Sequence, residues 1–340
     1  MQTDPYIVLP CFSLEPNKLA TFNRVFVKSQ MSKTGVFEKS KAQQNTITRD
    51  FHNFEISQNA HRTLKRKINW LYYLAKSKNV TTYSGKNIFN FKMSFITLTL
   101  PSAQQHTTAF ITKNLFNQFL TELRQRTNLE NYVWRLEFQT NGNVHYHIAT
   151  DIYLDYFFIQ KIWNRILDLH MYITPYTEKF KNLTLSAYNK LVNPSGKTDF
   201  SIIAKRFAKG CENKWNQPNT IDVKSVTNQK NISSYIAKYF SKNAENKTKC
   251  NKLDNEINSK SLRLWFCSRS LSKLNSITDF SEAVQINWSA LIADIKNVRK
   301  RVFEYATLFY FDFKNLCTFE SEIIHKTLKN YAYSLNYCSA

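Results

Sequence analysis

Glycine is scarce in this chain of 340 residues and its cysteines are unpaired in spacing, and both features exclude whole classes of protein. No two of the five glycines stand in a GxxxxGK[ST] or GxGxxG frame, so a P-loop ATPase and a Rossmann dinucleotide site are excluded. The six cysteines form no CxxC pair, which argues against a zinc ribbon or a disulfide framework and fits a reducing cytoplasm. No apolar run approaches the ~20 residues of a membrane span. The stretch MQTDPYIVLPCF lacks the features of a signal peptide. We therefore expect a cytoplasmic protein with no membrane partner.

Acidic residues are also few relative to basic ones. The chain has 47 Lys and Arg against 25 Asp and Glu, a formal net charge of +22. Segments 1–95 and 197–252 together carry 18 of these excess positive charges. An AT-rich genome, whose codons favour Lys and Asn, would account for part of the surplus. The remainder indicates a polyanionic partner bound in a groove that two parts of the chain build.

Hydrophobic periodicity indicates an α+β fold, because strands and helices interleave without a regular βαβ rhythm. We expect a central, mainly antiparallel sheet flanked by helices. The predicted strands are 91–101, 132–139, 144–150, 220–226 and 261–270. The predicted helices are 62–76, 107–125, 155–169 (capped by Asp155), 232–242 and 281–307, while residues 1–60 are expected to be irregular. The chain thus divides into a basic, partly helical region at 1–90, a central domain at 91–275 and a helical region at 276–340. Residues 171–219 form an insertion with some helix.

The stretch YVWRLEFQTNGNVHYHIAT (132–150) predicts a β-hairpin with a defined register. Matching apolar to apolar faces pairs Phe138 with Val144 or else with Tyr146, and both choices require a loop of odd length. We predict a three- or five-residue loop with Gly142 at positive φ. Either register places Glu137 and Gln139 on the face of the two histidines of the HYH stretch.

That shared face carries His145, His147 and Glu137, a set that suits a divalent metal with open coordination positions. Mixed nitrogen and oxygen ligands favour Mg²⁺ or Mn²⁺ acting as a Lewis acid on a phosphate oxygen. A purely structural use of the histidines is the alternative. A zinc hydrolase with an HxH strand in a (β/α)₈ barrel is another, although it needs further histidines at other strand ends.

The stretch ISSYIAKYFSK (232–242) forms the second constellation. On a helix, Tyr235 and Tyr239 lie on one face, one turn apart, and Lys238 begins a parallel row. The tyrosines could pack as core. They could also act as nucleophiles, because an ammonium and a metal-polarised phosphate help a phenolate to form and attack. Attack on a DNA phosphodiester would leave a phosphotyrosine link and a free sugar hydroxyl.

Taken together, these motifs resemble those of rolling-circle replication initiators of the HUH endonuclease superfamily. The chain is most similar to the replication proteins of single-stranded DNA microviruses and related plasmids. FITLTLP (95–101) resembles motif I, HYH (145–147) resembles motif II, and YIAKYFSK (235–242) resembles the two-tyrosine motif III. RLWFCSRSL (263–271) resembles the segment that follows motif III. The likeness spans about 91–271, but the insertion at 171–219 and the first 90 residues depart from the pattern.

The resemblance implies an RRM-like, palm-like nuclease core and a metal-dependent enzyme that nicks and rejoins single-stranded DNA at a replication origin in a bacterial host cytoplasm. It implies that His145, His147 and Glu137 bind Mg²⁺ or Mn²⁺. Tyr235 would form a 5′-phosphotyrosine and free a 3′-OH, Tyr239 would serve the second transfer, and Lys238 would lie near the phosphate. A host helicase and polymerase are the expected partners. A relaxase or transposase of the same superfamily and a non-catalytic origin-binding protein are the alternatives.

Overall fold

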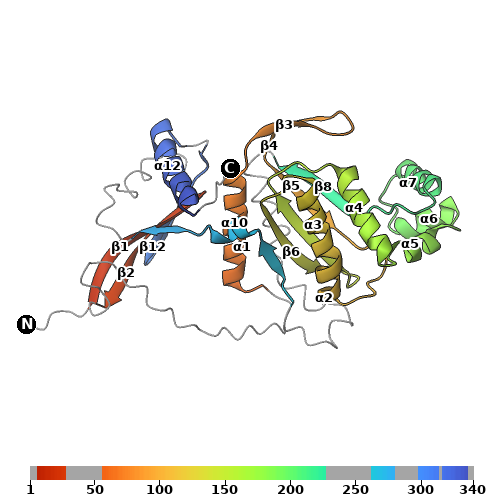
Figure 1. Ribbon diagram of the computed structural model, residues 1–340, viewed down its shortest axis with the longest axis horizontal. Coiled ribbons are helices and arrows are strands. Elements are labelled where there is room, and N and C mark those ends of the chain that lie inside the picture. Colours follow the sequence, from red (N-terminus) through yellow and green to blue (C-terminus); the bar gives the residue numbers. More distant parts are fainter. Residues whose placement is uncertain (1–5, 28–55, 227–261, 280–297, 314–315, 336–340) are drawn as a thin grey trace, which may run out of the picture. The chain divides into compact units, whose positions relative to one another are not determined.

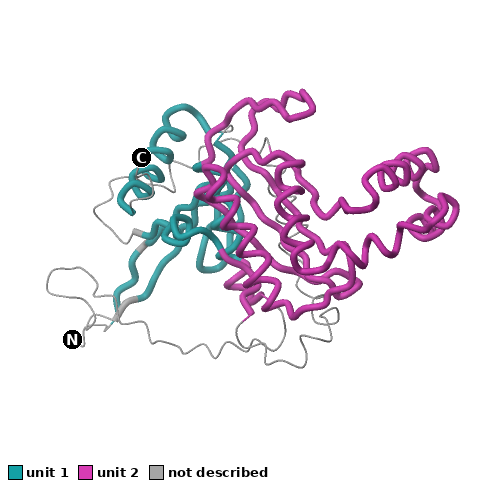
Figure 2. Tube along the Cα trace, turned by 45° about the vertical axis from the view of Figure 1, so that its right-hand side comes forward, with its two compact units in different colours: residues 1–50, 62–74, 267–340 teal, residues 51–61, 75–266 magenta. Residues whose placement is uncertain are grey.

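Two compact units make up the chain, and each is described by itself (Figure 2). The computed structural model describes residues 6–27, 56–226, 262–279, 298–313 and 316–335. Unit 1 comprises Met1–Asp50, Arg62–Leu74 and Cys267–Ala340, and unit 2 comprises Phe51–His61 and Ala75–Phe266. Among the described residues, no helix is both long and apolar enough to cross a membrane.

A five-stranded sheet forms the centre of unit 2, with the strand order β8-β5-β7-β6-β9. The strands are β5 (Met93–Leu98), β6 (Tyr132–Phe138), β7 (Val144–Thr150), β8 (Ile221–Val226) and β9 (Trp265–Cys267). The pairs β5–β7, β5–β8 and β6–β7 are all antiparallel. The predicted α+β class with antiparallel sheet is thereby confirmed, while the more specific RRM-like core stays a prediction.

Helices cover one face of this sheet, as α3 and α4 show in Figure 1. The predicted helix at 107–125 is continuous but changes its winding. It runs through α2 (Thr108–Phe110), a π-helical stretch η3 (Ile111–Phe116) and α3 (Asn117–Arg126). The predicted cap of α4 (Tyr156–Leu169) is confirmed, because the Asp155 carboxylate accepts hydrogen bonds from the Phe157 and Phe158 amides.

The sheet is fastened to these helices by the middle residue of the HYH stretch. Tyr146 is 1% exposed, and its ring stacks on Phe116 with centroids 4.0 Å apart. Its hydroxyl shares a hydrogen bond of 2.7 Å with Thr112 in the π-helical stretch. Trp134, on the neighbouring strand, meets both rings edge to face. Because side chains alternate along a strand, this burial turns the two flanking histidines to the opposite face.

The insertion at 171–219 contains helices, as predicted, and it has a small core of its own. The helices are α5 (Ile173–Phe180), α6 (Leu185–Val192) and α7 (Phe200–Glu212). The Trp215 ring packs among Phe180, Tyr188 and Ile203. It also lies against Gly210, where an added Cβ would come within 2.4 Å of the indole. That close approach explains a glycine inside a helix, a position that otherwise destabilises it.

Unit 1 contains a second antiparallel sheet, with the strand order β10-β1-β2-β12-β11. Its strands are β1 (Tyr6–Glu15), β2 (Lys18–Val27), β10 (Ile277–Asp279), β11 (Arg299–Phe303) and β12 (Ala306–Tyr310). Its helical elements are most of α1 (Gln58–Leu74), α10 (Arg269–Lys273) and α12 (Thr318–Ser334). The predicted helix at 62–76 corresponds to α1 and is confirmed.

Buried charges connect the separate chain segments of unit 1. The Glu15 carboxylate is 5% exposed and accepts hydrogen bonds from Lys18, Arg66 and Ser276. The buried Lys67 ammonium donates to the carbonyls of Ser272 and Leu274, at the end of α10. Such pairing is needed because an unpaired buried charge destabilises a fold strongly.

Three expectations for unit 1 and its border are wrong. Residues 1–60 are not irregular throughout, because 6–27 form the β1–β2 hairpin. The expected helix at 281–307 does not hold for its last part, where β11 and β12 form a second hairpin of β-branched and aromatic residues. The expected strand at 261–270 contains only the short β9 and gives way to α10 at Arg269.

Replacement of Tyr146 by alanine should lower the free energy of unfolding by about 3–5 kcal/mol, because a stacked and buried ring is lost. Tyr146→Phe keeps the ring and loses only the hydrogen bond to Thr112, so it should cost about 1 kcal/mol. Urea denaturation followed by circular dichroism measures both values. Equal losses in the two variants would show that the stacking on Phe116 does not anchor the strand.

Candidate functional site

The predicted register of the β6–β7 hairpin is confirmed. Phe138 lies opposite Val144, the first of the two expected pairings, and Gly142 has φ of 82°. The five residues 139–143 connect the paired strands, and the Gln139 amide donates to the Asn143 carbonyl. Glu137 therefore lies opposite His145.

The two imidazoles and the carboxylate meet on the face of the sheet opposite to Tyr146. The His147 Nε2 lies 2.8 Å from the Glu137 Oε1. The rings of His145 and His147 stack with centroids 4.6 Å apart. One ligand atom from each of the three residues lies within 4.8 Å of the others. The three side chains that the sequence pattern grouped are thus brought together.

Burial and neighbouring charge act on the ionisation of this group. Burial lowers the pKa of His145 to about 3, and the neighbouring His147 adds to this effect while Glu137 opposes it. Burial alone would raise the pKa of Glu137, but the hydrogen bond from His147 and the charges of the histidines and of Arg135 outweigh it and lower the pKa. At neutral pH, His145 is therefore a free base and Glu137 is ionised, which are the forms that bind a cation.

Two further residues of the site come from positions that the sequence pattern did not single out. The Thr97 hydroxyl, on β5, lies 3.2 Å from the His147 Nδ1 and orients that ring. Arg135, and not Gln139, is the cross-strand neighbour of His147, and its guanidinium is fully buried. The signal for Thr97 was its place in the strand FITLTLP, but its pairing with His147 is a contact between residues 50 positions apart.

The donor set fits a divalent cation. The buried Nε2 atom of His145 has no hydrogen-bond partner among the described residues. It faces the same space as the Glu137 carboxylate, so a cation there would satisfy an otherwise costly buried polar atom. Two imidazoles and one carboxylate leave coordination positions open. Thr97 would hold His147 from behind, as outer hydrogen bonds commonly do for metal-binding histidines.

The residues predicted to carry the covalent chemistry lie elsewhere in the chain. Tyr235, Lys238 and Tyr239 all fall within 227–261, outside the described residues. Their relation to the metal-ligand candidates stays a prediction.

Part of the predicted basic surface is visible on α7. Lys205, Arg206 and Lys209 lie on this helix away from its packed side, where Ile203 enters the small core around Trp215. A row of cations on one side of a helix favours contact with a polyanion. Whether this row joins the basic residues of segment 1–95 in one groove stays a prediction.

The pKa of His145 predicts how acid affects the metal-free protein. The unfolded chain binds a proton at this residue near pH 6.5, whereas the folded chain does so only at about pH 3. Stability contributed by the neutral imidazole should therefore be lost as the pH falls from 6.5 towards 3, by at most about 1.4 kcal/mol per pH unit. His145→Gln should lose less stability than the wild type between about pH 6.5 and 4.5 in urea denaturation with a chelator. Parallel losses would contradict the shift.

One comparison with known proteins gives a match. Residues 93–244 match the family model of the replication-associated protein ORF2, which supports a role in the initiation of replication. The matched segment contains β5, the β6–β7 hairpin with its three candidate ligands, and the stretch with both predicted tyrosines. No curated protein and no solved structure matches the chain.

Proposed function

We propose that this protein is a replication initiator that nicks and rejoins single-stranded DNA at an origin with a divalent metal and a tyrosine nucleophile. The observation that carries the proposal is the cluster of Glu137, His145 and His147 on one sheet face inside the matched segment 93–244. The row of cations on α7 and the net charge of +22 support a nucleic acid as the substrate.

The proposed metal is Mg²⁺ or Mn²⁺, held by His145, His147 and Glu137. When bound, it would supply Lewis-acid polarisation of a phosphate oxygen. The protein contributes the geometry: Tyr146 fixes the strand in the core, and Thr97 fixes the ring of His147. The buried position of His147, which is 3% exposed, limits the access of water to the ligand cluster.

In the proposed reaction, the phenolic oxygen of Tyr235 attacks the phosphorus of the scissile phosphodiester. The bond between phosphorus and the 3′ oxygen breaks, and the phenolic proton is lost to solvent while the leaving 3′ oxygen gains one. A 5′-phosphotyrosine and a free 3′-OH result, with Lys238 near the phosphate. Nucleophilic attack that stores the bond as a covalent intermediate allows the strand to be rejoined later.

Tyr239 would serve the second transfer, because helical spacing puts it one turn from Tyr235. One tyrosine could then hold a DNA end while the other cuts. Since the sequence contains no P-loop, a host helicase would open the duplex, and a host polymerase would extend the 3′-OH.

Cleavage of an origin-containing single strand should require Tyr235 and a divalent metal. We expect Tyr235→Phe to remove cleavage in Mn²⁺ and to remove the covalent adduct that mass spectrometry detects. Tyr239→Phe is the matched control, and it should still make the first cut but fail to rejoin strands. Equal activity of wild type and Tyr235→Phe would refute the enzyme hypothesis and leave a non-catalytic origin-binding protein. Loss of the first cut in Tyr239→Phe alone would exchange the two roles.

Replacement of both His145 and His147 by alanine should abolish Mn²⁺ binding in calorimetry and abolish cleavage. Binding of DNA should persist and remain sensitive to salt, because it is mostly phosphate neutralisation. Thr97→Val should weaken Mn²⁺ binding about 10- to 100-fold, and Thr97→Ser, which keeps the hydroxyl, should restore it. Unchanged Mn²⁺ affinity in the double variant would remove the metal site from the proposal.

A further inference from the structure

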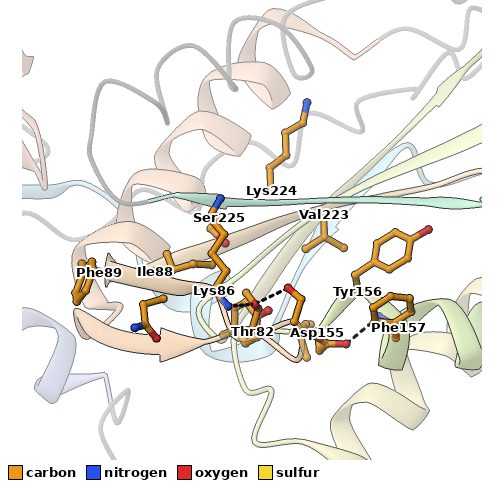
Figure 3. Close-up of a pocket in the computed structure, with 14 residues that line it drawn as sticks. Thr82, Lys86, Ile88, Phe89, Asp155, Tyr156, Phe157, Val223, Lys224 and Ser225 are labelled. Carbon is orange, nitrogen blue, oxygen red and sulfur yellow. Dashed lines mark hydrogen bonds between the residues drawn. The ribbon is translucent and has the colours of Figure 1, made fainter. Parts of the chain in front are cut away.

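A groove of about 850 Å³ lies in unit 2, between the β3–β4 hairpin, the start of α4 and strand β8 (Figure 3). The hairpin comprises β3 (Lys78–Thr81) and β4 (Asn87–Phe91). Strand β8 is an edge strand of the sheet as the described residues form it. The volume falls in the upper part of the range of ~300–1,000 Å³ that is usual for ligand sites. The groove is therefore large enough for an extended ligand rather than an ion.

Exposed aromatic rings line this groove from two sides. Phe89, on the hairpin, is 64% exposed, and Phe157, at the start of α4, is 51% exposed. Figure 3 shows the rings of Tyr156 and Phe157 next to each other, and their centroids are 5.2 Å apart. The exposed Tyr83 meets the other edge of Phe157 at 6.0 Å. Apolar rings gathered in a groove indicate a binding site more strongly than single exposed ones do.

The charge of the groove is positive where a ligand would enter. Lys86 is exposed and has no acidic partner among the residues that the structure describes. Lys224 pairs with Asp222 at 3.3 Å, and the side chains of both stay largely open to solvent. The one carboxylate that lines the groove, that of Asp155, already accepts hydrogen bonds from the Tyr83, Phe157 and Phe158 amides. An anionic ligand would thus meet two ammonium groups and one carboxylate whose charge is largely compensated.

Strand register connects the groove with the candidate metal ligands. Asp222 pairs with Thr97, and Thr97 pairs with His147, so the three lie in one row across β8, β5 and β7. Because neighbouring strands are ~4.8 Å apart, His147 and Asp222 are separated by roughly 10 Å. Lys224 is two residues further along β8 and so projects from the same face as His147. A strand of DNA that crosses this face towards β8 would reach the groove within a few nucleotides.

We propose that this groove binds single-stranded DNA next to the cleaved phosphodiester, with bases stacked on Phe89 and Phe157 and phosphates at Lys86 and Lys224. The proposal rests on the proposed function for its position relative to the cut. Single strands fit better than duplex DNA, because only unpaired bases can place their faces against aromatic rings. Stacking does not depend on base identity, so the groove would tolerate different sequences.

The test measures binding without cleavage, so it does not depend on the nuclease activity. Full-length protein in EDTA is titrated into a fluorescent oligothymidylate of roughly 20 nucleotides and into a duplex of equal length. The Phe89→Ala/Phe157→Ala double variant should bind the single strand about 10- to 100-fold more weakly, because two stacking contacts are lost. Its affinity for the duplex should stay unchanged.

Phe319→Ala is the matched control, since Phe319 is 65% exposed on α12 in unit 1 and lines no part of the groove. Lys86→Ala/Lys224→Ala should lower the salt dependence of single-strand binding by about 0.7 for each lost phosphate contact. Circular dichroism and thermal melting establish that each variant is folded. An oligonucleotide with iododeoxyuridine should crosslink on irradiation to a peptide with Phe89 or Phe157.

Single-strand affinity of the double aromatic variant equal to that of the wild type would overturn the proposal. Equal losses for single strand and duplex would also overturn it, because they would indicate a general charge effect. Failure of Tyr235-dependent cleavage with preserved binding in the groove would refute the proposed function alone. The two proposals can therefore fail separately.

Discussion

The alternation of side chains along β7 is the constraint on which the candidate site depends. Tyr146 must enter the core, where its ring stacks on Phe116 and its hydroxyl meets Thr112. His145 and His147 then have no choice of face, because a slip of one residue would bury both imidazoles among apolar side chains. The packing of one tyrosine thus supports a polar cluster that it never touches. Helix, π-helical stretch and hairpin act as one support for two imidazoles and a carboxylate.

The hairpin could be predicted from the sequence because both of its strands alternate clearly and leave few registers. The pairing of Phe138 with Val144, the positive φ of Gly142 and the position of Glu137 opposite His145 all follow from matching apolar faces. The cap of α4 was equally accessible, because an aspartate before an apolar helical pattern is a local signal. These are features that neighbouring residues decide among themselves.

Contacts between distant segments could not be predicted in the same way. Thr97 reaches His147 only because β5 pairs with β7 across the sheet, and no local pattern announces this pairing. The β1–β2 hairpin was missed because its strand signals are mixed with polar residues, and β11 was taken for part of a helix because its basic residues suit either structure. The groove beside β8 likewise arises from three segments that are far apart in the chain.

The strand order of unit 1 has a consequence for how the chain tolerates trimming. Strand β2 lies between β1 and β12, although β12 comes almost 280 residues later. Deletion of the first 27 residues would therefore remove two adjoining strands from the sheet and leave one side of β12 without its backbone hydrogen bonds. An open edge of this kind invites pairing with other chains and aggregation. A shortened protein made to isolate the segment 93–244 should accordingly omit β11 and β12 as well as β1 and β2.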